Sequence, residues 1–226
     1  MKIKVCGITS VDQLKELETI GIDYAGLIFY SQSPRYVLKK LNSRDVMNQQ
    51  LSILKVGVFV NSSEENIMTQ VELYGLDLVQ LHGDETPSFC NHISNHVKVI
   101  KAFRLNEKNG KNIDWMIKPY EEVCDHYLFD TKSLSGFGGS GEKFDWKLLE
   151  KNQINKPFFL SGGIGIDDVE NIRNFQHPFL FGVDINSCFE VEAGVKDMDL
   201  IKNFRDKLNS IKTKQSQTLP DELYNR

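Results

Sequence analysis

The sequence predicts a single-domain α/β protein with a (βα)8 TIM barrel fold. Short runs rich in β-branched and aromatic residues recur eight times, roughly every 20 to 30 residues, which is typical of βα units. Most of these runs are almost continuously apolar, as expected for parallel strands that are covered on both faces. Stretches with helical features lie between them. Eight such repeats fit one barrel domain over residues 1–211.

The expected strands follow one another along the whole domain. Each is rich in β-branched or aromatic residues, which favour strands. In chain order the runs are IKVCGI (3–8), YAGLIFY (24–30), LKVGVFV (54–60), DLVQLHG (77–83), VKVIKAF (97–103), HYLFD (126–130), PFFLSGG (157–163) and FLFGVDI (179–185).

The clearest helices are predicted from their boundary residues. Ser10 is a suitable N-cap for the first helix, and Ser62 or Ser63 for the second, while Gly21 and Gly75 end them. Acidic residues in the first turns complement the helix dipole. The stretches are residues 10–21, 62–75, 165–175 and 195–211.

An open doubly wound sheet is the alternative architecture. It is disfavoured because no G-x-G-x-x-G dinucleotide motif follows the first strand. Residues 212–226 are polar and contain a proline, so we expect a mobile tail beyond the barrel.

Composition restricts the classes of partner. Lysine and arginine number 27 against 31 acidic residues, a net charge of −4, which argues against nucleic-acid binding. No apolar run approaches the roughly 20 residues of a membrane span, and the first residues do not resemble a signal peptide. We therefore expect a cytoplasmic protein with no membrane or nucleic-acid partner.

The cysteines are Cys6, Cys90, Cys124 and Cys188. They form no C-x-x-C pair, so a zinc site is not expected, and a reducing cytosol disfavours a disulfide. Cys6 then has two interpretations, an inert core thiol or a reactive one. For a lone cysteine in a strand, the inert thiol is the default.

Two glycine-rich runs follow the last two predicted strands. They are LSGGIG (160–165) and GVDINS (182–187), and loops at these positions commonly bind phosphate in this fold. Glycine lets the backbone approach a ligand, and a short helix starting near residues 186–187 would add its dipole. Tight turns alone are the alternative. A third run, 135–141, lacks the lysine of a P-loop and suits either a lid or a plain connector.

Cys6 and Asp130 end the first and sixth predicted strands, so both should face the same mouth of the barrel. A thiol and a carboxylate there suit proton transfer on a small phosphorylated substrate. The alternative for Asp130 is a structural hydrogen bond. Arg35, stiffened by Pro34, could bind a carboxylate or lie on the surface, and His82 could contact a ligand or pack as a neutral imidazole.

The motifs KVCGIT, GLIFYSQSPRYV, VGVFVN, VQLHGDE, FDTKS, GGSGEKFDW, LSGGI and GVDINS occur in this order between residues 2 and 208. Together they resemble the phosphoribosylanthranilate isomerase family of tryptophan biosynthesis. The resemblance implies a barrel without cofactor or metal. It also implies an Amadori rearrangement of N-(5-phosphoribosyl)anthranilate to 1-(2-carboxyphenylamino)-1-deoxyribulose 5-phosphate by a monomer or homodimer.

The resemblance also implies roles for individual residues. Cys6 would be the general base, ionised because its surroundings lower its pKa. Asp130 would be the general acid, and Arg35 would bind the anthranilate carboxylate. His82 is a further expected substrate contact because of its position at the end of a strand and not because of the resemblance. The expected phosphate-binding residues are Gly162, Gly163, Asp184, Asn186 and Ser187.

One position departs from the family pattern, since Cys188 stands where a glycine is usual. A cysteine there would strain the loop if the position requires a positive φ. The alternatives are a non-catalytic phosphate-binding barrel and another sugar-phosphate barrel enzyme, such as indole-glycerol-phosphate synthase or a histidine-pathway isomerase. Those two enzymes are expected to use lysine with glutamate, or paired aspartates, and a cysteine ending the first strand disfavours both.

Overall fold

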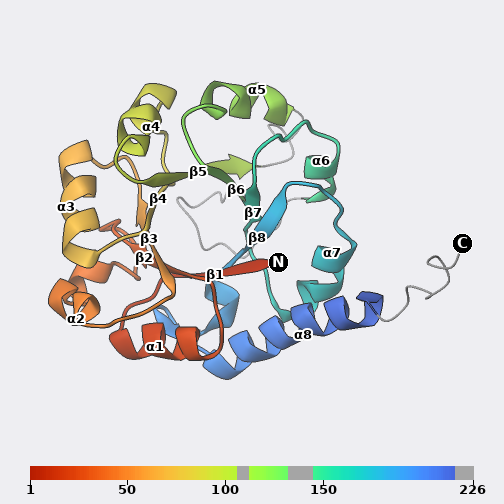
Figure 1. Ribbon diagram of the computed structural model, residues 1–226, viewed down its shortest axis with the longest axis horizontal. Coiled ribbons are helices and arrows are strands. Elements are labelled where there is room, and N and C mark those ends of the chain that lie inside the picture. Colours follow the sequence, from red (N-terminus) through yellow and green to blue (C-terminus); the bar gives the residue numbers. More distant parts are fainter. Residues whose placement is uncertain (106–111, 132–144, 217–226) are drawn as a thin grey trace, which may run out of the picture.

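Strand β1 pairs with both β2 and β8, and this double pairing closes the sheet. In the described part of the chain, eight strands, each parallel to its neighbours, form a closed barrel with helices around it (Figure 1). The structure is a computed structural model and describes residues 1–105, 112–131 and 145–216, with side chains of the last helix as far as residue 210. The predicted (βα)8 fold is confirmed.

The strands lie close to the runs that the sequence predicts. Because parallel strands run in one direction, their carboxyl ends meet at one mouth of the barrel. The strands are β1 (Lys2–Cys6), β2 (Tyr24–Ile28), β3 (Leu54–Phe59), β4 (Leu78–Leu81), β5 (Lys98–Leu105), β6 (His126–Thr131), β7 (Phe158–Leu160) and β8 (Leu180–Ile185).

The helices alternate with these strands and form the outer ring in Figure 1. Several contain only four or five residues. The helices are α1 (Val11–Thr19), α2 (Ser43–Met47), α3 (Glu64–Tyr74), α4 (Pro87–Ser94), α5 (Ile113–Ile117), α6 (Lys147–Glu150), α7 (Val169–Asn174) and α8 (Met198–Ser216).

The predicted helix boundaries are confirmed in α1 and α3. The Ser10 side chain accepts a hydrogen bond from the Gln13 amide at 3.2 Å. Ser63, rather than Ser62, caps α3, with its hydroxyl 3.3 Å from the Asn66 amide. The α3 helix ends at Gly75, whose φ of 57° is in the left-handed region.

The other two predicted helices differ in detail. The stretch 165–175 forms a 3-10 turn, η4 (Ile166–Asp168), followed directly by α7. Near the chain end, residues predicted as helix form part of a hairpin of β9 (Glu190–Glu192) and β10 (Val195–Lys196). Helix α8 begins after this hairpin and continues to Ser216. Residues 217–226 and the glycine-rich run 135–141 lie outside the described residues.

Two hydrophobic layers follow from the alternation of side chains along the strands. One face of each strand packs against the helices. The other face fills the barrel with a separate apolar cluster drawn from six strands, namely Tyr24, Val56, Leu78, Ile100, Ala102, Leu128 and Phe159. This cluster fills the barrel below the carboxyl ends of the strands, and polar side chains lie above it at the mouth.

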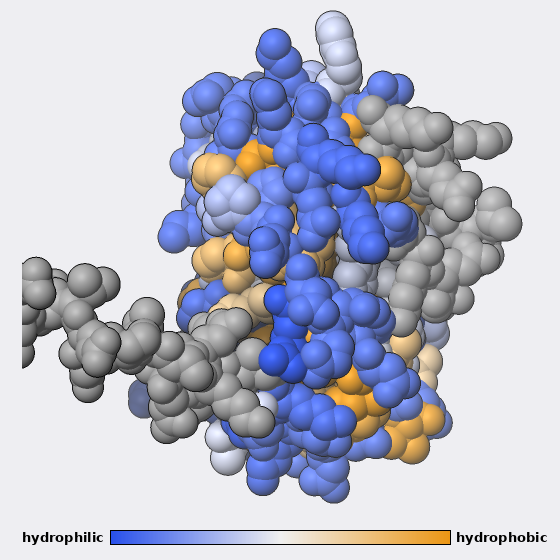
Figure 2. All heavy atoms as spheres, turned by 90° about the vertical axis from the view of Figure 1, so that its right-hand side faces the viewer, coloured by the Kyte–Doolittle hydropathy of each residue, from blue (hydrophilic) through white to orange (hydrophobic). Residues whose placement is uncertain are grey.

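Hydrophilic residues dominate the described part of the face in Figure 2, with hydrophobic residues in small separate groups. No helix of the described residues is long and apolar enough to span a membrane.

Candidate active site

Four of the predicted site residues lie at the carboxyl ends of strands, inside the mouth. Cys6 ends β1, His82 follows β4, Asp130 lies near the end of β6, and Asp184 near the end of β8. Leu128 belongs to the apolar cluster in the barrel, and Asp130, two residues later, faces the same way. The charge of Asp184 interacts with those of Asp130 and His82, so these side chains share one site.

The Cys6 thiol occupies space that a neighbouring glycine leaves free. Cys6 pairs in register with Gly26 on β2, and a Cβ atom on Gly26 would lie 2.8 Å from Sγ. The thiol packs against Ile28 and Val58 and is 5% exposed. An alanine at position 26 would displace the sulfur, so Gly26 fixes its position.

Lys4 is a site residue that sequence reasoning missed. It lies two residues before Cys6 on the same face of β1 and is fully buried in the barrel. Its Nζ is 2.8 Å from Oδ1 of Asp184. Burial disfavours the ammonium group, but Asp184 and Cys6 favour it, and the pKa of Lys4 is raised.

The ionisation of Cys6 differs from the sequence-based expectation. Burial raises the pKa of the thiol, and this effect exceeds the opposing influence of Lys4 and Lys196. Asp184 adds to the rise. The expectation that the surroundings lower the pKa of Cys6 is therefore wrong, although two cations that favour the thiolate are present.

Asp184 is predicted to bind phosphate, yet its carboxylate lies inside the barrel. It is 6% exposed, and burial raises its pKa although Lys4 opposes the change. A carboxylate repels phosphate, and its Oδ1 already accepts a hydrogen bond from Lys4. The Asp184 side chain is thus better placed to influence Cys6 than to bind an anion.

Asp130 has two polar neighbours. Its Oδ1 accepts the amide hydrogen of Thr131 at 2.9 Å, and its Oδ2 is 3.3 Å from Nε2 of His82. The other ring nitrogen of His82, Nδ1, is 2.7 Å from Nε2 of Gln80. Asp130, His82 and Gln80 therefore form a continuous polar chain across β6 and β4.

Arg35 is bound to an acidic residue that sequence reasoning also missed. Its Nε is 2.8 Å from Oε1 of Glu190, and its Nη2 contacts Oε2 in a two-point pair. The hydrogen bonds to Glu190 raise the pKa of Arg35, and the Cys6 charge adds to this rise, so the guanidinium lies near the thiol. Glu190 fixes the guanidinium at the mouth.

Lys196 completes this group. Its buried Nζ is 2.7 Å from Oε1 of Glu190 and 2.7 Å from Oδ1 of Asn186. Burial lowers the pKa of Lys196 although Glu190 opposes the change. Burial alone would raise the pKa of Glu190, but hydrogen bonds from Arg35 and Lys196 hold it below its ordinary value.

The two predicted phosphate loops are adjacent, because β7 and β8 pair in the sheet. Gly162 and Gly163 have φ values of 93° and 64°, which only glycine adopts readily. A Cβ atom on Gly162 would also lie 2.7 Å from the amide nitrogen of Thr131. Ser187 begins the 3-10 turn η5 (Ser187–Phe189), so the predicted short helix is present.

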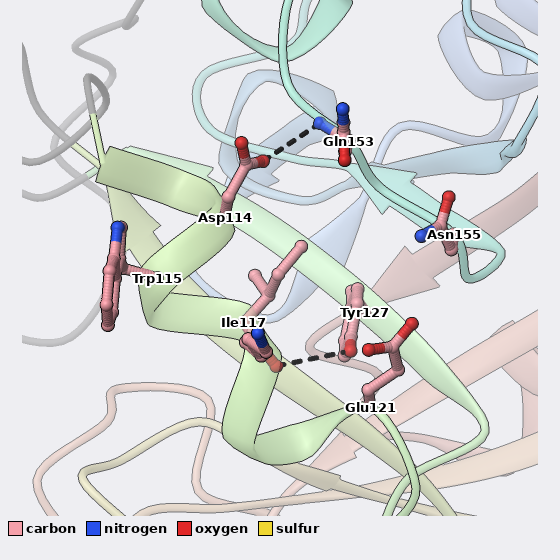
Figure 3. A pocket seen from close by; sticks show the side chains of 8 residues that line it. Asp114, Trp115, Ile117, Glu121, Tyr127, Gln153 and Asn155 are labelled. Carbon is pink, nitrogen blue, oxygen red and sulfur yellow. Dashed lines mark hydrogen bonds between the residues drawn. The ribbon is translucent and has the colours of Figure 1, made fainter.

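A cavity of about 400 Å³ lies elsewhere, on the outer wall of the barrel. Figure 3 shows α5 side chains on one side and Gln153 and Asn155 on the other, with Asp114 bound to the Gln153 amide at 2.8 Å. No predicted site residue lines this cavity, so it is separate from the mouth.

Comparison with known proteins identifies the family. A family model described as N-(5'-phosphoribosyl)anthranilate (PRA) isomerase matches residues 3–207. The chain belongs to the PRA isomerase family. A PRA isomerase of Parabacteroides distasonis is 42% identical over 206 residues, which cover 90% of this chain and 91% of that protein. The resemblance inferred from the motifs is confirmed.

Solved PRA isomerase structures share the fold. The enzyme of Thermotoga maritima is 31% identical and superposes with a TM-score of 0.81, covering 93% of this chain and 99% of that one. A structure of monomers generated from the dimeric T. maritima enzyme has the same identity and coverage, with a TM-score of 0.76.

Family membership establishes the activity. The protein is an aldose–ketose isomerase of tryptophan biosynthesis, and the predicted Amadori rearrangement of N-(5-phosphoribosyl)anthranilate is its reaction. The sequence-based prediction of function is thus confirmed at the level of the PRA isomerase family.

Cys188, the departure from the PRA isomerase pattern, does not strain the loop. Among described residues other than glycine, Asn61 alone has a positive φ, so Cys188 is outside the left-handed region. Its exposed thiol lies 3.7 Å from the carbonyl oxygen of Gly163. The cysteine is accommodated beside the predicted phosphate loop.

Proposed function

We propose that Cys6 is the general base and Asp130 the general acid of the isomerisation. The supporting observation is that both side chains lie inside one mouth of the barrel and both interact with the charge of Asp184. Proton transfer at two points of one small substrate requires such an arrangement.

The first step opens the sugar ring. Asp130 gives its proton to the furanose oxygen, and the bond between that oxygen and C1′ breaks with its electron pair on oxygen. The lone pair of the anthranilate nitrogen forms the C1′=N bond of a Schiff base. Asp130 is left as a carboxylate, which the Thr131 amide and His82 can stabilise.

The second step removes the C2′ proton. The Cys6 thiolate takes this proton, and the C–H electron pair forms the C1′=C2′ bond of an enolamine while nitrogen becomes neutral. Ketonisation then moves one proton from the 2′-hydroxyl to C1′. Cys6 releases the proton it took and Asp130 regains one, so no proton is gained or lost overall.

Lys4 and Asp184 are proposed to set the ionisation of Cys6 in opposite directions. Lys4→Met should raise the pKa of Cys6 further and move the low-pH limb of kcat/KM to higher pH, since it removes the buried cation beside the thiol. Asp184→Asn should move that limb to lower pH, because it removes a buried negative charge. Profiles of kcat/KM against pH for both variants test this pair of shifts.

Lys4→Arg is the matched control, because it keeps the positive charge beside Asp184 and should retain a limb close to that of the wild type. If Lys4→Met and Asp184→Asn shift the limb in the same direction, Lys4 is not the counter-ion of Cys6. Circular dichroism confirms that each variant is folded.

Arg35 is proposed to bind the anthranilate carboxylate. Glu190 supports this role because it holds the guanidinium at the mouth, near Cys6. Arg35→Lys should raise KM roughly 10- to 100-fold with little change in kcat, since a charge-assisted bond contributes about 1.5–3 kcal/mol. Steady-state kinetics test this, and an unchanged KM would remove Arg35 from the substrate site.

The substrate phosphate is proposed to bind at the backbone of Gly162, Gly163, Asn186 and Ser187, with His82 contacting the sugar. The left-handed glycines support the first of these assignments because they allow close approach of the main chain. Asp184 contributes its backbone position in β8, whereas its side chain acts on Lys4 and Cys6.

We also propose that the enzyme works in the cytoplasm as a monomer or homodimer. The family's place in amino-acid biosynthesis supports the location, and the description of the T. maritima enzyme as dimeric supports the larger assembly. Light scattering on the purified protein distinguishes the two states.

The proposed function is tested by rescue of a tryptophan auxotroph that lacks this isomerisation. The wild-type chain should restore growth without tryptophan, and a chain with both Cys6→Ala and Asp130→Ala should not. Failure of the folded wild-type protein to restore growth would favour the non-catalytic phosphate-binding barrel.

A further inference from the structure

Glu190 is a buried carboxylate that binds two cations at once. It begins β9, directly after η5, and its side chain is 4% exposed. Its Oε1 accepts hydrogen bonds from Arg35, from Lys196 and from the backbone amide of Gly194, the last at 3.1 Å. Its Oε2 accepts hydrogen bonds from Nε and Nη2 of Arg35. One carboxylate is therefore shared between a guanidinium and an ammonium group.

This charged group lies beside the backbone that follows Cys6. Gly7 has a φ of 82°, and a Cβ atom there would lie 2.6 Å from Cδ of Arg35 and 2.9 Å from Oδ1 of Asn186. The same Oδ1 atom accepts a hydrogen bond from Lys196 at 2.7 Å. The absence of a side chain at Gly7 thus lets both cations and their carboxylate partner gather next to the end of β1.

The substrate of the isomerisation carries an anionic group at each end. The anthranilate carboxylate has one negative charge, whereas a phosphate monoester has a charge of about −1.5 to −2 at pH 7. An arginine can bind either group through two parallel hydrogen bonds. The glycine loops after β7 and β8 offer backbone N–H groups, which carry only partial charges. On charge alone, two free cations would attract the phosphate more strongly than the carboxylate.

The charge of Glu190 removes this ambiguity. Arg35 and Lys196 each carry one positive charge and Glu190 one negative charge, so the group has a net charge of +1. One carboxylate balances that charge, and a phosphate dianion exceeds it. A phosphate at the guanidinium would also be repelled by Glu190, on the order of twice as strongly as a carboxylate in the same place.

Glu190 also limits the part of Arg35 that a ligand can reach. It occupies Nε and Nη2, so Nη1 is the guanidinium nitrogen without a hydrogen-bond partner among the described residues. The rest of the fork is no longer free to surround a phosphate. The geometry and the charge of Glu190 therefore favour the same ligand, a carboxylate.

We propose that Glu190 determines the orientation of the substrate, because it reserves the Arg35 end of the mouth for a carboxylate and excludes phosphate from it. The inference rests on the proposed sites of the two groups, with the carboxylate at Arg35 and the phosphate at the glycine loops. Glu190 acts on the substrate through its two cations and is a positioning residue that determines specificity. The ligands that it excludes are phosphate monoesters and inorganic phosphate.

Glu190→Gln should create a second phosphate site at Arg35. With inorganic phosphate as the inhibitor, the wild type should show linear competitive inhibition, because a single bound phosphate excludes the substrate. In the variant, the slope of the reciprocal plot should increase with the square of the phosphate concentration, because two phosphates bind. Half-inhibition should need at least about tenfold less phosphate, the effect of one charge-assisted hydrogen bond.

Two further variants are the controls for charge. Glu190→Asp keeps a carboxylate beside the two cations, and its inhibition should stay linear. Asp23→Asn removes a carboxylate that lies 2.6 Å from Nζ of Lys2, at the opposite end of the barrel. It changes the net charge of the protein by the same amount as Glu190→Gln and should show wild-type inhibition by phosphate.

Thermal stability provides a measurement that does not depend on turnover. A ligand that binds the folded protein raises its melting temperature, and a second site raises it further. Added phosphate should therefore stabilise Glu190→Gln more than Asp23→Asn, since the general stabilising effect of phosphate is common to both. The additional stabilisation should disappear when Arg35→Met is combined with Glu190→Gln.

Lys196→Met tests the same charge balance from the other side. It leaves Glu190 paired with Arg35 and lowers the net charge of the group to zero, without leaving a buried lysine unpaired. Inhibition by anthranilate should weaken, while inhibition by inorganic phosphate should stay at the wild-type level. This variant carries the test if Glu190→Gln does not fold, and an unchanged inhibition by anthranilate would then overturn the proposal.

Linear inhibition of folded Glu190→Gln by phosphate overturns the proposal. This holds even if less phosphate is needed, because Glu190 would then act on the original phosphate site. Arg35→Met alone separates the inference from the proposed function. If this variant loses inhibition by phosphate, phosphate binds at Arg35 in the wild type and the proposed sites are wrong. If it retains that inhibition, the proposed sites stand, and the Glu190→Gln result decides the inference.

Discussion

Cys6→Ser should lower kcat roughly 10²- to 10⁴-fold, the usual contribution of a positioned acid or base. Serine nearly matches cysteine in size and fits the space beside Gly26, so substrate binding and KM should change little. Its hydroxyl does not ionise near neutral pH and cannot replace a thiolate. The measurement is product fluorescence from freshly prepared substrate.

Cys90→Ala is the matched control for this prediction. Cys90 is also a buried thiol, but it lies on α4 outside the barrel, and burial raises its pKa to about 11. Cys90→Ala should keep the wild-type kcat. Wild-type turnover by Cys6→Ser would remove the thiol from the mechanism.

Asp130→Asn should also lower kcat roughly 10²- to 10⁴-fold, because an amide cannot protonate the leaving ring oxygen. The asparagine oxygen can still accept the Thr131 amide that Asp130 binds at 2.9 Å, so the strand end should keep its geometry. Steady-state kinetics test the loss of kcat.

Asp125→Asn provides the control at the opposite end of the barrel. Asp125 precedes β6, and its Oδ2 accepts the Val99 amide at 2.7 Å, a bond that asparagine can also accept. Its kcat should match that of the wild type. Wild-type kcat in Asp130→Asn would mean that another group is the acid.

Local patterns were sufficient to predict the architecture. The alternation of apolar strand runs with capped helices depends on residues that are neighbours in the sequence. Ser10 begins a helix through its side-chain hydrogen bond, and Gly75 ends one through its left-handed conformation. The stretch 195–211 was less predictable, because its first residues pair with Glu190–Glu192 in a hairpin. That pairing competes with an amphipathic pattern that favours a helix throughout.

The positions of Cys6 and Asp130 at the mouth followed from their places at strand ends, whereas the residues around them did not. Lys4 and Asp184 are far apart in the chain and meet only because β1 and β8 close the barrel. The two-residue spacing between Lys4 and Cys6 was the available signal, since alternate residues of a strand share a face. It would have suggested a cation beside the thiol.

The pair of Arg35 and Glu190 was hidden for the same reason, because its residues belong to opposite ends of the chain. The pKa of Cys6 could not be read from sequence either. It depends on burial opposed by Lys4 and Lys196, and both depend on the closed barrel. Local sequence thus predicted which residues lie at the mouth, while long-range pairing determines their environment.

The most direct test of the central claim is alkylation of Cys6 with mass-spectrometric mapping. A Cys188→Ser background removes the exposed thiol, since the other three cysteines are buried. We predict that iodoacetamide inactivates this variant in proportion to Cys6 modification and faster as pH rises. The reduced form of the product, 1-(2-carboxyphenylamino)-1-deoxyribulose 5-phosphate, should protect it. Complete modification of Cys6 with activity retained would contradict the account.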